Sequence, residues 1–260
     1  MNGFLYAALG ALGLAGFLLW QHLQERKKHL ALVATETSST GTLRELAGAA
    51  ATAAGVGAFR QFVEVKGTVH PGPSGPLKAP FSGTECAWYW TRVTHHWREA
   101  YTDNDGNRRY RDQSERLQSD RSTEPFTLRD DEGDLLVVPG TNVANARKTV
   151  SENRDSEPET STVKIGKFEF SSSSRQGDSR YQYEEWVLPL QSRLFVQGDA
   201  TDSDGRLEIR KPEGSRKMVL DTRSEEEVTT ESRKHMQLTL GLAAGLIVLA
   251  IVLLVVGLLR

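Results

Sequence analysis

The chain has 260 residues, with 32 Lys and Arg against 34 Asp and Glu, so its formal net charge is -2. A nucleic-acid-binding surface needs a basic excess gathered on one face, and this balanced sequence contains no basic cluster of that kind, so no nucleic-acid partner is expected. The single cysteine, Cys86, excludes an internal disulfide and hence a disulfide-stabilised scaffold. The composition is also unlike that of a coiled coil or a low-complexity chain.

Two segments, 2–20 and 238–259, contain no Asp, Glu, Lys, Arg or His. They have 19 and 22 residues, and a helix needs about 20 apolar residues to cross the roughly 30 Å hydrocarbon core. We therefore predict two transmembrane helices. A cleavable signal peptide is the alternative for the first segment, but Met1–Gly3 contains no basic residue and the apolar run exceeds the usual length of about 7–15 residues. An uncleaved anchor is favoured.

The inner flanks of both apolar segments are basic, with Arg26, Lys27 and Lys28 after the first and Arg233 and Lys234 before the second. The outer flanks contain one basic residue, Arg260. The positive-inside rule then predicts that residues 21–237 are cytoplasmic and that both termini lie across the membrane. Because this part is tethered at both ends, we expect it to lie close to the bilayer.

Residues 21–59 are predicted to form a helical juxtamembrane linker. Gln21–Leu32 is expected to extend the first membrane helix into water. Thr42 and Glu45 have the spacing of a capping box, which predicts that a second helix begins there and runs over about 43–58. That helix is rich in small residues, so it either lies on the following domain, which we favour, or packs closely against another helix in the membrane.

Residues 60–222 are predicted to form a β-domain, followed by a linker at 223–237. The β-domain alternates short runs of β-branched and aromatic residues with turn signals, which is typical of a small antiparallel barrel or sandwich. The fold class is therefore mainly β (α+β overall), with this domain between two transmembrane helices and a short helix before its first strand. Strands are predicted at Phe62–Val69, Cys86–Trp97, Tyr110–Leu117, Phe126–Leu128, Leu135–Val138, Val163–Phe170, Tyr181–Val187, Leu194–Val196, Leu207–Arg210 and Lys217–Leu220.

The turns and loops between these strands are also predicted. Thr102–Asn107 contains Asp105-Gly106, a hairpin signal. Two polar segments, 151–160 and 171–180, are expected to be mobile loops. Within the longest strand patterns, the side chains of Trp88, Trp90 and Trp186 are predicted to be largely buried.

Two residue types could carry chemistry in the strand Cys86–Trp97. Cys86 has Trp88 and Trp90 at i+2 and i+4, which places all three on one strand face and indicates a core thiol rather than a nucleophile, since no base lies nearby in the sequence. His95 and His96 are adjacent, so their side chains point to opposite faces and cannot share a metal.

The Asp-rich turns around Gly106 and Gly205 suggest calcium binding, but an EF-hand loop needs acids at both its first and twelfth positions. These positions hold Tyr101 and Asp112 around Gly106, and Ala200 and Lys211 around Gly205, so neither turn is an EF-hand. The chain also contains no phosphate-binding glycine loop, HExxH or GxSxG motif. We expect no catalytic, cofactor-binding or metal-binding residue.

Three stretches carry a family resemblance. The first joins Val65–Gly67 through Pro76–Leu77 to Phe81–Tyr89, with Ser82-Gly83-x-x-Cys86 inside it; the second runs from Pro125 to Gly133 and into Val137–Pro139; the third joins Tyr183–Pro189 to Leu194–Ala200. In this order, between two apolar segments, they resemble the GIDE-type or BAM ("beside a membrane") domain. This domain belongs to a family of membrane ubiquitin ligases with a mitochondrial member and shorter bacterial and archaeal members. The resemblance covers about residues 30–259.

The resemblance implies ubiquitin-protein ligase activity, which in the family depends on a RING after the second membrane helix. A RING holds two zinc ions with eight Cys and His ligands. This chain ends at Arg260 and has one Cys and six His without ligand spacing, so we expect no RING. The six histidines are His22, His29, His70, His95, His96 and His235.

The predicted function is that of a non-catalytic, membrane-anchored GIDE/BAM-type module. It would bind an unknown protein, peptide or lipid partner at the surface of a prokaryotic plasma membrane, without a cofactor. The alternative is an enzyme: a RING-type ubiquitin transferase or ligase subunit, as the resemblance implies, or a hydrolase with an unrecognised site. In the mitochondrial relative, the corresponding domain lies in the intermembrane space.

Overall fold

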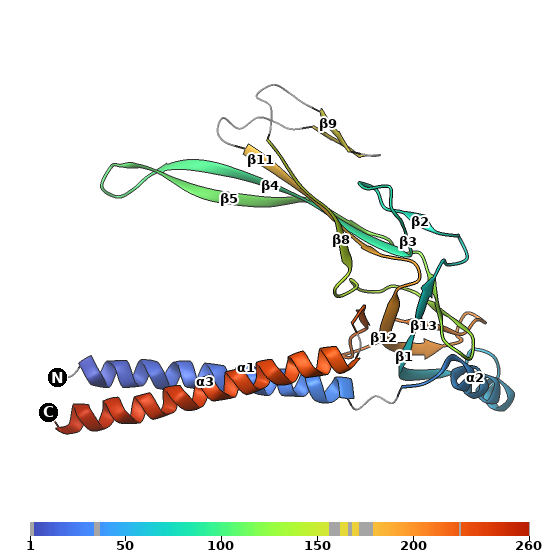
Figure 1. Cartoon of the computed structure of the whole chain (residues 1–260), viewed down its shortest axis with the longest axis horizontal. Helices are drawn as coiled ribbons and strands as arrows, with labels where there is room; N and C mark the ends of the chain where they lie inside the picture. Colours follow the sequence, from blue (N-terminus) through green and yellow to red (C-terminus); the bar gives the residue numbers. More distant parts are fainter. Residues whose placement is uncertain are drawn as a thin grey trace. The chain divides into compact units, whose positions relative to one another are not determined.

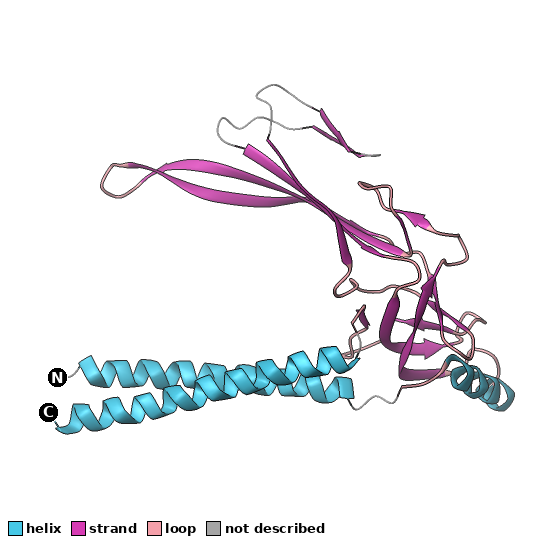
Figure 2. Ribbon diagram, in the orientation of Figure 1, coloured by secondary structure: helices cyan, strands magenta, loops and turns pink. Residues whose placement is uncertain are grey.

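The structure is a computed structural model that describes residues 3–33, 37–155, 162–165, 168–171, 179–223 and 225–259. The described part of the chain is mainly β, with three helices (Figures 1 and 2). It divides into two compact units, one made of Met1–Glu36 with Arg223–Arg260 and the other of Thr37–Thr222.

The first unit is a pair of antiparallel helices, α1 (Gly3–Val33) and α3 (Glu225–Leu259), whose outer ends carry the two termini (Figure 1). Among the described side chains of this unit, the buried ones are alanines, Ala15, Ala243 and Ala250, which allow the two backbones to approach closely. One segment of the described residues, Gln237–Val256, is long and apolar enough to span a membrane. The structure therefore supports the second of the two predicted spans.

The core of the second unit is a five-stranded barrel. Its strands follow the order β1-β6-β7-β13-β12, and β12 pairs again with β1 to close it. The bounds are β1 (Arg60–His70), β6 (Phe126–Arg129), β7 (Asp134–Val137), β12 (Arg193–Thr201) and β13 (Glu208–Arg210), and β14 (Val219–Asp221) adds to β12. The β7–β13 pair is parallel, so the prediction of a wholly antiparallel domain is wrong at that pair. Taken along the chain, the barrel order is first-second-third-fifth-fourth, a Greek-key arrangement of the OB type.

Helix α2 (Thr40–Ala54) packs on the barrel through Leu43 and Ala47, which belong to its apolar core. The predicted capping residue, Thr42, is wrong: Ser39 is the N-cap, and its hydroxyl accepts a hydrogen bond from the Thr42 amide at 3.1 Å. The helix therefore begins three residues earlier than predicted. The reason is a contact that is remote in sequence, because the Asp130 carboxylate accepts hydrogen bonds from both the amide (2.7 Å) and the hydroxyl (2.6 Å) of Thr40.

A four-stranded sheet is inserted into the barrel sequence, in the order β5-β4-β11-β8. Its strands are β4 (Trp88–Thr102), β5 (Arg108–Arg121), β8 (Arg147–Asp155) and β11 (Ser179–Leu188). Beyond Trp97, the β4–β5 hairpin continues past the end of β11 as a two-stranded arm (Figure 1). The predicted turn at its tip is confirmed, with Gly106 at a φ of 84°.

Two shorter hairpins complete the described strands. One pairs β2 (Leu77–Lys78) with β3 (Glu85–Cys86), and the other pairs β9 (Thr162–Ile165) with β10 (Phe168–Ser171), where a single strand at 163–170 was predicted.

The predicted loop at 151–160 is wrong over 151–155, which belong to β8; residues 156–160 lie outside the described residues. In the predicted loop at 171–180, Ser171 ends β10 and residues 179–180 begin β11, while 172–178 lie outside the described residues. Strand β8 was missed because it is an edge strand whose residues 151–155 are all exposed. It therefore lacks the apolar alternation by which a half-buried strand is recognised.

Candidate functional site

The four-stranded sheet places functional side chains on two faces that follow from the strand register. Trp90 pairs with Trp186 and Arg92 with Glu184, so these four residues share one face, here called the tryptophan face. Val93 pairs with Tyr183, and with Tyr181 these residues form an apolar cluster on the opposite side, here called the tyrosine face.

The tryptophan face holds a stacked aromatic pair with two cations over it. The rings of Trp90 and Trp186 have centroids 4.4 Å apart and planes inclined by 19°. The Arg92 guanidinium carbon lies 5.4 and 5.2 Å from the two centroids, and Lys148 Nζ lies 5.1 Å from that of Trp186. Trp90 and Trp186 are partly buried, with most of their surface removed from water as predicted. Trp90 packs against the barrel core, and the two stacked rings shield one another. Trp88 is fully buried in the barrel core, as predicted.

Glu184 is the acid that binds these two cations. Its side chain is only 5% exposed and accepts hydrogen bonds from Arg92 Nε at 2.8 Å and from Lys148 Nζ at 2.7 Å. Burial by itself raises the pKa of Glu184, but the bonds from Lys148 and Arg92 outweigh burial and hold the pKa below its ordinary value. Glu184 is therefore ionised and bound to both cations. Its role fits that of a structural anion rather than that of a proton donor.

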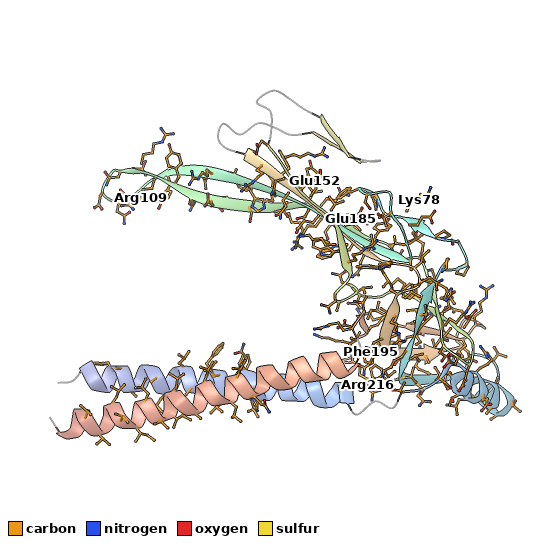
Figure 3. All side chains as sticks on the ribbon, viewed as in Figure 1. Lys78, Arg109, Glu152, Glu185, Phe195 and Arg216 are labelled. Carbon is orange, nitrogen blue, oxygen red and sulfur yellow. The ribbon has the colours of Figure 1, made fainter. Side chains whose placement is uncertain are left out.

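Glu185, the next residue, lies on the tyrosine face and is fully buried (labelled in Figure 3). Its carboxylate accepts hydrogen bonds from the Phe81 amide at 2.6 Å, the Ser82 amide at 3.3 Å, the Ser82 hydroxyl and the Thr149 hydroxyl at 2.7 Å. These bonds attach the loop before β3 to the middle of β11. The strand pattern alone contained the signal for both acids, because successive residues of a strand point to opposite faces and two adjacent glutamates must therefore place one carboxylate on each face.

Cys86 is fully buried beside Ala79 and Val187. Burial, followed by the nearby charge of Glu185, raises the pKa of the Cys86 thiol to about 12, so the reactive thiolate is strongly disfavoured. The prediction that Cys86 is a core residue is confirmed. Its placement on one continuous face with the two tryptophans is wrong, since the chain bends at Ala87 and Trp88 enters the separate barrel core.

His95 and His96 lie on opposite faces, as predicted. The His95 ring stacks on Tyr181 with centroids 4.6 Å apart, and its Nε2 lies 2.6 Å from Ser179 Oγ. His96 Nε2 lies 3.1 Å from Gln182 Oε1 on the other face. Over the residues that the structure describes, no group of three or more His, Cys, Asp or Glu side chains is arranged to hold a metal ion.

In both Asp-rich turns an aspartate accepts hydrogen bonds from backbone amides. Asp103 accepts hydrogen bonds from the amides of Asp105 and Asn107, and its pKa is lowered by the bond from Asn107 first and by that from Arg109 second. Asp202 accepts hydrogen bonds from the amides of Gly57 (3.1 Å) and Phe59 (2.9 Å), which joins the chain after α2 to the end of β12.

The stretches that carry the family resemblance have structural roles as well. Asp130 accepts hydrogen bonds from Thr40, the first residue of α2, and from the amides of Glu132 and Gly133 in the turn before β7. Gly198 lies in β12 where a Cβ would come within 2.6 Å of Ile209 and 2.8 Å of the Arg210 carbonyl oxygen, so the barrel leaves room only for glycine. These residues, like Glu185, join elements that are distant in sequence.

A family model described as GIDE, E3 ubiquitin ligase, matches residues 96–257 of the chain. The match includes the arm, the end of the barrel sequence and the apolar segment of α3. No curated protein and no solved structure matches the chain.

Proposed function

Since the chain belongs to the GIDE family, we propose that it is a membrane-anchored, non-catalytic module whose β unit binds a partner at the bilayer surface. The observation that carries this proposal is the four-stranded sheet outside the barrel. It presents a half-buried aromatic and cationic cluster and a 14-residue edge strand, β5, most of which is exposed. A long exposed edge strand can pair with other chains and cause aggregation, so proteins usually protect such an edge or use it to bind a partner.

The family description favours a second candidate, ubiquitin-ligase activity. A RING needs eight Cys and His ligands, and these 260 residues contain one Cys, which is buried and has a raised pKa. Ligase chemistry would therefore need catalytic residues from outside these 260. The chemistry of the described residues supports binding rather than transfer.

Two measurements distinguish the candidates. The purified chain should contain no stoichiometric zinc and should leave a ubiquitin-charged conjugating enzyme intact, whereas robust ubiquitin discharge would overturn the non-catalytic function. A photo-crosslinking residue at Ser114, on β5, should give a discrete adduct in native membranes. The same residue at Leu46, exposed on α2, should not. Equal adducts from both positions would argue against the sheet as the binding surface.

We also propose that both α1 and α3 cross the membrane and that the β unit is on the cytoplasmic side of a prokaryotic plasma membrane. Helix α1 packs beside α3 and exposes large apolar side chains, among them Leu9, Phe17 and Trp20. A continuous apolar surface of this kind is unfavourable in water and is typical of a surface that contacts lipid. The basic residues at 26–28 and 233–234 support the orientation. A reporter after Arg260 should face the side opposite to a reporter inserted at Gly106; the same side for both would contradict two spans.

A further inference from the structure

Charge is divided unequally between the two faces of the four-stranded sheet. The register places seven basic and three acidic residues on the tryptophan face: Arg92, Arg98, Arg108, Arg116, Arg121, Lys148 and Arg180 against Asp112, Asp155 and Glu184. It places four basic and five acidic residues on the tyrosine face: Arg109, Arg111, Arg147 and Arg154 against Glu99, Glu115, Asp120, Glu152 and Glu185. The balanced charge of the whole chain hides this asymmetry, because alternate residues of a strand point to opposite faces.

The basic excess on the tryptophan face is also available to a partner. Of its three acids, Glu184 is buried and already bound by two cations, and Asp112 pairs with Arg98 at 3.2 Å. Arg108, Arg116 and Arg121 are exposed and have no carboxylate partner among the described residues. Arg108 lies over the Tyr110 ring and Arg121 donates a hydrogen bond to the Asn142 side chain, so neither contact neutralises the charge.

Amphipathic aromatic residues accompany these charges. Tyr110 is 58% exposed and pairs with Ala100 on the tryptophan face of the arm, and the half-buried Trp90 and Trp186 lie further along the same face. Tyr and Trp are enriched where a protein meets the membrane interface, because one end of each ring is apolar and the other is polar.

We propose that the tryptophan face docks on an anionic lipid surface, a proposal that rests on the function above and names the partner. The basic residues extend from Arg92 to Arg108 at the far end of the arm, over on the order of 30 Å. A single small anion cannot neutralise charges spread that far, whereas a charged bilayer can. The apolar segment Gln237–Val256 would hold the same chain in the membrane, which keeps the local concentration of lipid headgroups high.

The test uses the full chain in nanodiscs of phosphatidylcholine alone or with about 30% phosphatidylglycerol. An environment-sensitive fluorophore is attached to Ser114→Cys on the tryptophan face or to Gln113→Cys on the tyrosine face. The native Cys86 is fully buried and is not expected to react. The emission of the label at 114 should shift to shorter wavelength in phosphatidylglycerol discs and return to its original wavelength in about 0.5 M NaCl. The emission of the label at 113 should not shift.

The matched variants each remove three arginines. Arg108→Gln/Arg116→Gln/Arg121→Gln should lower the ratio of docked to free sheet by up to about 100-fold, whereas Arg109→Gln/Arg111→Gln/Arg154→Gln, on the tyrosine face, should lower it much less. Identical signals in the two lipids, or equal losses for both variants, would overturn the proposal. A label at 114 that responds to added polyglutamate but not to phosphatidylglycerol would also overturn it, and would leave the non-catalytic binding function standing with an acidic polypeptide as partner. Ubiquitin discharge would instead overturn that function itself.

Discussion

The three tryptophans of the sheet region differ in how much of their surface the fold removes from water. Trp88 is fully buried in the barrel core, while Trp90 and Trp186 stack on a sheet face that stays partly open. Trp88→Ala should therefore lower the free energy of unfolding by about 3–5 kcal/mol. Trp90→Ala should lower the free energy of unfolding by roughly 1–2 kcal/mol, because folding buries less of the Trp90 side chain than of Trp88. Denaturant unfolding of the detergent-solubilised chain measures both, and equal costs would contradict the two environments.

The buried thiol of Cys86 gives a pH dependence with a definite sign. Its folded pKa of about 12 lies above the ordinary value of about 8.5, so folding favours the protonated thiol. The associated stability is fully present below about pH 8.5 and is lost as the pH rises toward 12. At pH 8 the folded chain should resist Ellman's reagent and react after unfolding. Ser114→Cys, with an exposed thiol, is the positive control, and rapid reaction of native Cys86 would show that the thiol is accessible.

At the scale of elements, Asp130 joins the start of α2 to the turn between β6 and β7. Burial alone raises its pKa, but hydrogen bonds from the Thr40 hydroxyl and amide and from two turn amides outweigh burial and lower it. Asp130→Ala should reduce the free energy of unfolding by about 2 kcal/mol near neutral pH, since it removes a helix-start partner and a turn acceptor together. The neighbouring exposed Asp131→Ala should change it by less than about 0.5 kcal/mol.

The low folded pKa of Asp130 also sets the pH range of that effect. A lowered pKa stabilises the fold above the ordinary value of about 3.9, and this contribution is lost as the pH falls. The difference between the parent chain and Asp130→Ala should therefore shrink in unfolding curves recorded toward pH 3. A difference that stays constant with pH would mean that the carboxylate charge is not what holds the helix start.

At the scale of the whole molecule, the arm adds surface without adding core. None of the three apolar clusters contains a residue from 98–121. Replacing residues 99–111 with Asn-Gly, which joins the paired Arg98 and Asp112 by a two-residue turn, should change the unfolding temperature by less than about 3 °C. Thermal unfolding followed by circular dichroism measures this. A loss of the fold would mean that the arm stabilises the barrel.

The local features of this protein could be predicted from the amino-acid sequence. Period-two runs such as Phe62–Val69 and Tyr181–Val187 marked real strands, because each has one face in a core and alternation is the direct consequence. The Asp105-Gly106 turn was predictable from the φ that only glycine adopts easily. The motifs that resemble the GIDE family were visible for the same reason: they consist of residues such as Gly198 and Asp130, for which the fold permits few substitutes.

Features that depend on pairing between distant segments could not be predicted and are visible only in the folded chain. The barrel closes through the parallel pair of β7 and β13, and the start of α2 is set by Asp130, 90 residues from Thr40. The edge strand β8 is polar except at Val150, so its pairing with β11, rather than an apolar alternation, makes it a strand. The basic tryptophan face was equally hidden, because a net charge is a sum over residues whereas a surface charge depends on which strand lies beside which, and in what register.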